Sequence, residues 1–152
     1  AIGIFVTWNE EFRHSIEQLT AVVLAHELAH AYSHIGFDTD GNQWDSEDML
    51  ATDIHVIEGL AQFYTKVFCE RQRKRDPGLL GAFNDLLEIQ RNNDLTWYTC
   101  FEEWAKGHVH RNEIVRLAMI DTRAQGLRKD KEFLHQIATY EDKWARPGET
   151  GR

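Results

Sequence analysis

Cysteine and proline are scarce in this chain of 152 residues, which contains two of each. Cys69 and Cys100 are too few for a disulfide framework and lack the close spacing of metal-binding cysteines. We therefore expect reduced, unpaired thiols, which favour the cytoplasm without deciding the compartment. No apolar run is long enough to span a bilayer, and no signal-peptide pattern is present. Because the sequence begins at Ala1 rather than Met, the lack of a signal-peptide pattern says little about targeting.

Basic residues are in the minority, 17 against 25 acidic ones, which gives a formal net charge of −8. Nucleic-acid binding depends on clustered Lys and Arg side chains. The one dense basic run, residues 71–75, falls at the expected end of a helix, where cations interact favourably with the helix dipole. The charge balance therefore argues against a nucleic-acid partner. The length and the 42% hydrophobic content fit one globular domain.

Apolar periodicity and capping signals predict a mainly helical chain with one strand at its front edge. Residues 2–7 are β-branched and aromatic, as in a strand. The capping-box spacing of Thr7 and Glu10 predicts a helix that runs to about Ser33, with a stop at Gly36. Helix-breaking Gly, Pro and Asn residues mark the boundaries of further predicted helices, at about 46–73, 79–90, 96–106, 111–125 and 129–145.

Residues 26–30 read His-Glu-Leu-Ala-His, an H-E-x-x-H motif inside the first helix. Positions i and i+4 of a helix share one face, so His26 and His30 can bind the same zinc ion through one ring nitrogen each. Glu27 can then take a proton from a water that the ion activates. The composition gives roughly 0.04 chance matches to the motif in a chain of this length. The alternative is a pair of hydrogen-bonded core histidines.

A catalytic zinc ion needs a third protein ligand, and two patterns for it fail. The extended motif H-E-x-x-H-x-x-G-x-x-H does not fit, because Ser33 and Gly36 stand where Gly and His are required. His34 would lie about 12 Å from His26 along a straight helix, too far to share one ion.

Glu58 on the next helix is the third candidate ligand. It opens the run Glu-Gly-Leu-Ala, and the small residues Gly59 and Ala61 would let this helix approach the first one closely in an antiparallel pair. His55 lies three residues earlier and is an alternative ligand or a substrate contact, although a supporting or surface role is favoured. We therefore expect one zinc ion per chain, held by His26, His30 and Glu58.

A strand, an H-E-x-x-H helix and a following E-G-x-A helix resemble the gluzincin metallopeptidases over roughly residues 2–66. The resemblance implies that Glu27 is the general base and acid. It also implies that the strand at 2–7 binds extended substrate through its backbone, by β-augmentation. The zinc ligands that it implies are His26, His30 and Glu58.

Three departures from the gluzincin pattern bear on function. Gln62 stands where many gluzincins have an acid that steadies a zinc-binding histidine, and Asp48 or Asp53 is a candidate to supply a carboxylate instead. Family members usually have several strands before the active-site helix, so either the sheet is reduced or the chain is a fragment of a longer protein. The residue that stabilises the oxyanion has no recognisable motif, and its candidates are Tyr98, His108 and His110.

These observations predict a mainly α (α+β), zincin-like helical metallopeptidase domain over residues 1–152, with a short edge strand before the active-site helix. We expect zinc-dependent hydrolysis of a peptide or protein substrate, with Glu27 as the base and Tyr98 or His108 among the catalytic residues. Two alternatives remain open. One is a non-catalytic zinc-binding or protein-interaction domain that retains the motif, and the other is a zinc hydrolase of non-peptide amides. The oligomeric state is left open.

Overall fold

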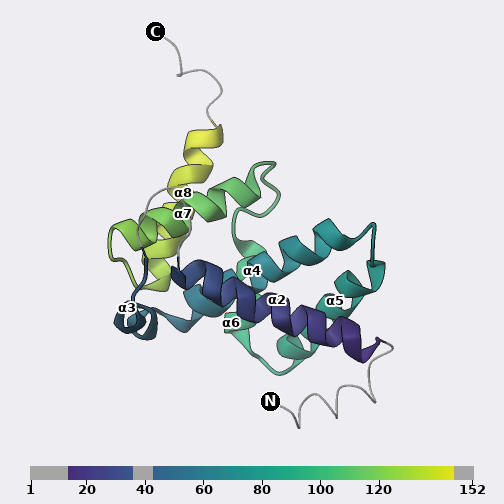
Figure 1. The fold of residues 1–152 in the computed structure, drawn as a ribbon. Coiled ribbons are helices and arrows are strands. Elements are labelled where there is room, and N and C mark those ends of the chain that lie inside the picture. The colour runs from purple at the N-terminus through teal and green to yellow at the C-terminus, as the bar shows by residue number, and fades with distance from the viewer. Residues whose placement is uncertain (1–13, 36–42, 146–152) are drawn as a thin grey trace.

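The computed structural model describes residues 14–35 and 43–145, which form helices stacked around a central helix, α4 (Figure 1). In chain order the elements are α2 (Ile16–Ile35), α3 (Ser46–Ala51), α4 (Ile54–Gln72), α5 (Pro77–Asn92), α6 (Thr96–Thr99), the 3-10 helix η1 (Cys100–Glu103), α7 (Arg111–Ala124) and α8 (Asp130–Ala145). No strand occurs within these two ranges, which confirms the mainly α class. The strand predicted at 2–7 lies outside the described residues. No described helix has both the length and the apolar character needed to cross a membrane.

The motif-bearing helix α2 begins at Ile16, because a capping box precedes it. The hydroxyl of Ser15 accepts from the backbone N–H of Gln18 at 3.2 Å, and the Gln18 side chain accepts from the Ser15 N–H at 3.3 Å. This reciprocal pair satisfies donors that a helix start leaves free. The prediction of one continuous helix from near Glu10 is therefore wrong about its start, and the Thr7–Glu10 signal lies outside the described residues.

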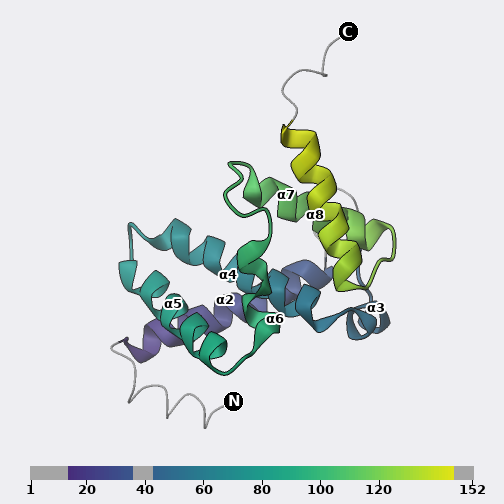
Figure 2. The ribbon, with the colours of Figure 1, turned by 180° about the vertical axis from the view of Figure 1, so that it is seen from behind.

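Helices α2 and α4 run antiparallel, as predicted. Gln18, near the start of α2, donates to Asp76, just beyond the end of α4, at 2.9 Å. His30, in the last third of α2, lies 3.4 Å from Glu58 in the second turn of α4. Helix α5 then turns back and packs against both helices, as the view from behind shows (Figure 2).

The predicted helix at 46–73 is interrupted at Thr52 and Asp53. Thr52 has an extended backbone, with φ −79° and ψ 143°. The Asp53 side chain accepts from the N–H of His55 at 3.0 Å and caps a new helix. Asp favours such a cap because its short carboxylate competes with continued helix. The prediction of one helix is therefore wrong, and the break sets the direction in which α4 leaves α3.

The segment at 96–106 is also less regular than predicted. It consists of α6 followed by η1 and ends at Glu103, and Ala105 has a positive φ of 46°. A non-glycine residue rarely takes this conformation, which is incompatible with helix. The turn places Trp104 and Ala105 in the core, where both are 2% exposed.

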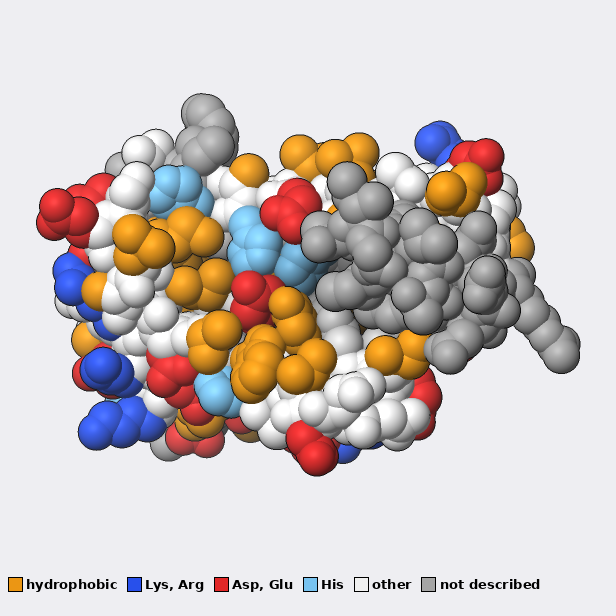
Figure 3. Space-filling view, turned by 90° about the horizontal axis from the view of Figure 1, so that it is seen from below, with side chains coloured by type: hydrophobic (Ala, Val, Ile, Leu, Met, Phe, Trp, Pro, Cys, Tyr) orange, Lys and Arg blue, Asp and Glu red, His pale blue; other side chains and the backbone are white. Residues whose placement is uncertain are grey.

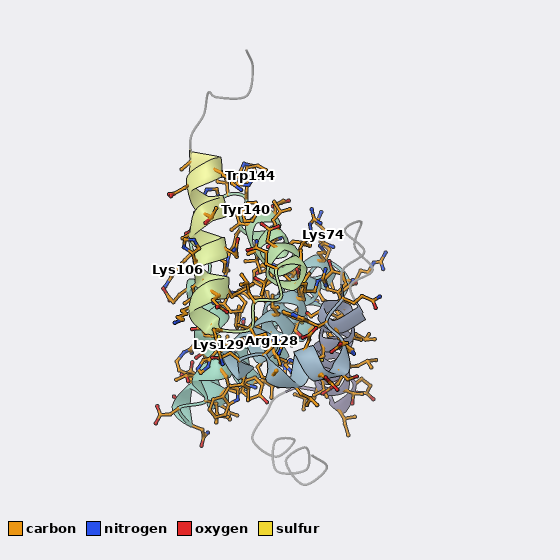
Figure 4. The ribbon with its side chains drawn as sticks, turned by 90° about the vertical axis from the view of Figure 1, so that its left-hand side faces the viewer. Lys74, Lys106, Arg128, Lys129, Tyr140 and Trp144 are labelled. Atoms are coloured by element: carbon orange, nitrogen blue, oxygen red, sulfur yellow. The ribbon has the colours of Figure 1, made fainter. Side chains whose placement is uncertain are left out.

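The hairpin of α7 and α8 closes the fold, and α8 also touches α4. The backbone N–H of Asp53 donates to the carbonyl of Arg128 at 2.8 Å, so the start of α8 lies beside the start of α4. Figure 4 shows Arg128 and Lys129 at this end of α8, and Tyr140 and Trp144 toward the other end. The largest fully buried side chains include Phe83, Phe101, Phe133, Leu60 and Ile114.

Gly59 has a different role from the one that the sequence suggested. A Cβ atom on Gly59 would lie 2.4 Å from Cη2 of Trp104 and 2.9 Å from Sγ of Cys100. The missing side chain at Gly59 therefore lets the Trp104 ring pack against α4, and it is not what brings α4 close to α2. The ring has little freedom to move, since its far side contacts Phe133 with ring centroids 4.8 Å apart.

We predict that Gly59→Ala destabilises the protein. The overlap with Trp104 should cost about 1–3 kcal/mol, which outweighs the gain of up to about 1 kcal/mol from replacing a helical glycine with alanine. Urea unfolding of the wild type and the variant measures this difference. In a Trp104→Phe background the two clashing ring atoms of Trp104 are gone and only Sγ of Cys100 remains close, so the same substitution should be less harmful. A Gly59→Ala protein as stable as the wild type would contradict this account of the glycine.

Candidate metal centre

Three side chains from α2 and α4 meet with their ligand atoms in contact. Nε2 of His26 lies 3.2 Å from Oε2 of Glu58 and 3.1 Å from Nε2 of His30. Nε2 of His30 lies 3.4 Å from the same carboxylate oxygen. The cluster thus presents two imidazole nitrogens and one carboxylate oxygen to a common point, and it could hold a metal ion.

The spacing of these atoms matches a tetrahedral zinc site. With zinc–nitrogen and zinc–oxygen bonds of about 2.0–2.1 Å, neighbouring ligand atoms stand roughly 3.3 Å apart. The three edges in the structure are 3.1, 3.2 and 3.4 Å. A set of two histidines and one glutamate leaves the fourth position open, as catalytic zinc sites do. The residues therefore fit the ion in both chemistry and size.

The surroundings of the cluster keep Glu58 ionised. The side chains of His26, His30 and Glu58 are 16%, 18% and 19% exposed. Burial, the largest single influence, acts to raise the pKa of Glu58. Hydrogen bonds and electrostatic interactions with His26 and His30 together outweigh it and lower the pKa to about 2. Glu58 is therefore a carboxylate near neutral pH, the form in which it can bind a metal ion.

Tyr98 and Glu27 lie beside the cluster. Both line a cavity of about 140 Å³ together with His26, and the Tyr98 ring centroid is 6.0 Å from that of His26. Burial raises the pKa of Tyr98, and the charges of Glu58 and Glu27 raise it further, so the phenol keeps its proton. Glu27 is exposed and thus open to solvent. Histidine and acidic side chains gather in the middle of the face seen in Figure 3.

The structure does not bring His108 and His110 to this cavity. The two rings lie 5.9 Å apart, and His110 packs on Trp144 with ring centroids at 4.1 Å. Trp144 stands about 21 Å along α8 from the end that lies beside α4 (Figure 4). Of the three candidates for stabilising an oxyanion, only Tyr98 lies by the cluster of His26, His30 and Glu58. The assignment of His108 as a catalytic residue is not supported by its position.

His34 and His55 stand outside the cluster as well. His55 is held by Asp53 at 3.1 Å through Nδ1 and by the Thr96 hydroxyl at 3.2 Å through Nε2. This network ties the start of α4 to the start of α6, two residues before Tyr98. The bond to Thr96 could not be predicted from the sequence, because Thr96 is distant along the chain. The signal that was present is the capping residue Asp53, two positions before a histidine.

Neither of the two candidates, Asp48 and Asp53, takes the place of the acid that Gln62 replaces. Gln62 donates to Gln90 on α5 at 2.9 Å. Asp48 pairs with Arg128 and Asp53 with His55, so these two carboxylates are engaged away from His26 and His30. Nδ1 of His30 is buried without a hydrogen-bond partner among the described residues. The orientation of His30 therefore depends on packing and on Glu58.

Comparison with protein-family models, curated proteins and solved structures gave no match to this chain. The interpretation of the site therefore depends on its own geometry.

We predict that Glu58→Ala lowers zinc affinity by more than about a hundredfold. This exceeds the usual effect of removing a residue that only hydrogen-bonds to a metal ligand. His55→Ala should retain zinc, since its ring bonds Asp53 and Thr96 instead. Metal content after dialysis against a competing chelator, measured by mass spectrometry, compares the two variants. If His55→Ala loses zinc and Glu58→Ala keeps it, the ligand set is wrong.

Proposed function

We propose that the protein is a zinc-dependent hydrolase of the gluzincin metallopeptidase type, with His26, His30 and Glu58 as ligands. The observation that carries the proposal is the convergence of these ligand atoms at the spacing of a tetrahedral site. The motif glutamate, Glu27, stands at the same cavity. A site that serves stability alone has no need of a base beside the ion.

A zinc ion bound here supplies a Lewis acid that polarises a carbonyl group and acidifies a water molecule. Glu27 accepts the proton of the attacking water and delivers it to the leaving nitrogen. Its exposure gives it access to that water. Tyr98, across the cavity and protonated, donates a hydrogen bond to the oxygen on which negative charge develops.

Peptides are the proposed substrates because the spacing of the two motifs, H-E-x-x-H and E-G-x-A, resembles that of gluzincins. A non-catalytic zinc domain is the second candidate. It is favoured by Gln62, which bonds Gln90 in the position where many gluzincins have an acid. Retention of Glu27 at the cavity favours the hydrolase.

We predict that Glu27→Gln retains zinc but lowers peptide turnover by about a hundredfold or more, since the amide cannot accept the proton. His30→Ala should lose both zinc and activity, and some stability with them. Metal analysis and a broad peptide-library digest, read by mass spectrometry, measure both properties. Glu70→Gln is the matched control, because Glu70 is also an exposed helical glutamate and does not line the cavity.

Two outcomes would count against the hydrolase. Unchanged turnover in Glu27→Gln would show that Glu27 is not the base. Wild-type protein that holds zinc and cleaves no peptide in the library would favour the non-catalytic domain instead.

A further inference from the structure

The face of α2 that points away from His26 and His30 borders a large groove. Leu24 and Leu28 each stand two residues before a zinc-binding histidine, which places them about 200° around the helix from it. They line a cavity of about 740 Å³ between α2, α4 and α7. Cavities of about 300–1,000 Å³ hold small organic ligands.

The walls of this groove are mainly apolar. Leu24 and Leu28 are 56% and 60% exposed, and Phe68 on α4 is 39% exposed. Phe63 and Val67 line the same groove from α4. Scattered exposed leucines are common on protein surfaces, but large apolar side chains from adjacent helices around one hollow indicate a binding surface.

Two arginines give the groove a cationic edge. Arg71 from the last turn of α4 and Arg116 from α7 both line it, and Glu113 is the one acid among its lining residues. No ion pair to either arginine occurs among the described residues. In a chain of net charge −8, two guanidinium groups beside an apolar hollow are complementary to an anionic ligand.

We propose that this groove binds a free single-chain aliphatic carboxylate. Its hydrocarbon chain would lie against Leu24, Leu28 and Phe68, and its carboxylate would accept hydrogen bonds from Arg71 and Arg116. The site is separate from the proposed zinc centre, because α2 stands between the two. Binding should therefore persist in His30→Ala protein that remains folded.

The test is calorimetric titration of the full chain with saturated fatty acids, from octanoate to dodecanoate, below their micelle concentrations. Each added methylene should tighten binding by up to about fourfold. Dodecanol, which lacks the carboxylate, should bind about tenfold or more weakly than dodecanoate. A dissociation constant for dodecanoate above the millimolar range would overturn the proposal. Equal dissociation constants for octanoate and dodecanoate would overturn it as well.

Two variants locate the site. Leu28→Asn should weaken dodecanoate binding, whereas Leu50→Asn should not, because Leu50 is 87% exposed and lies outside the groove. Arg71→Gln/Arg116→Gln should weaken dodecanoate and leave dodecanol unchanged, with Arg73→Gln/Arg75→Gln as the control. Equal binding by all variants would overturn the assignment. Sedimentation that shows a wild-type dimer and a Leu28→Asn monomer would also overturn the assignment, because a second copy of the chain would then cover the groove.

Discussion

The contact of His26 and His30 with Glu58 sets how α2 and α4 pack. Three polar side chains, each more than four-fifths covered, meet in an interface whose neighbouring residues are mostly apolar. Sliding one helix by a turn, about 5.4 Å, would separate the carboxylate from both imidazoles. A buried carboxylate without partners is strongly unfavourable, so the ligand cluster also selects the register of the helix pair.

The other features of the site follow from this register. Antiparallel packing leaves Glu27 on the open side of α2 and directs α5 back across both helices, where Gln90 meets Gln62. The break at Asp53 starts α4 one turn before Glu58, and the bridge from Asp53 through His55 to Thr96 holds α6 against α4. Tyr98 consequently stands near His26. The same arrangement puts Leu24 and Leu28 on the opposite side of α2, against the groove.

Local sequence signals predicted the helical class and the meeting of His26, His30 and Glu58, because H-E-x-x-H spacing and antiparallel packing need only helix geometry to bring these side chains together. They did not predict features that depend on long-range packing. The partner of Gly59 proved to be Trp104, and Gln62 met Gln90 from another helix. His108 and Tyr98 looked equivalent in the sequence, and only the tertiary fold separated them. The break at Asp53 was readable in principle, since Asp is a preferred cap.

We propose that His26, His30 and Glu58 together hold one zinc ion. X-ray absorption spectroscopy at the zinc edge of the zinc-loaded protein tests it most directly. We expect four or five nitrogen and oxygen neighbours at about 2.0–2.2 Å, with the outer-shell scattering of two imidazole rings. A sulfur neighbour at about 2.3 Å, which only Cys69, Cys100 or a methionine could supply, or a spectrum without imidazole scattering, would contradict it.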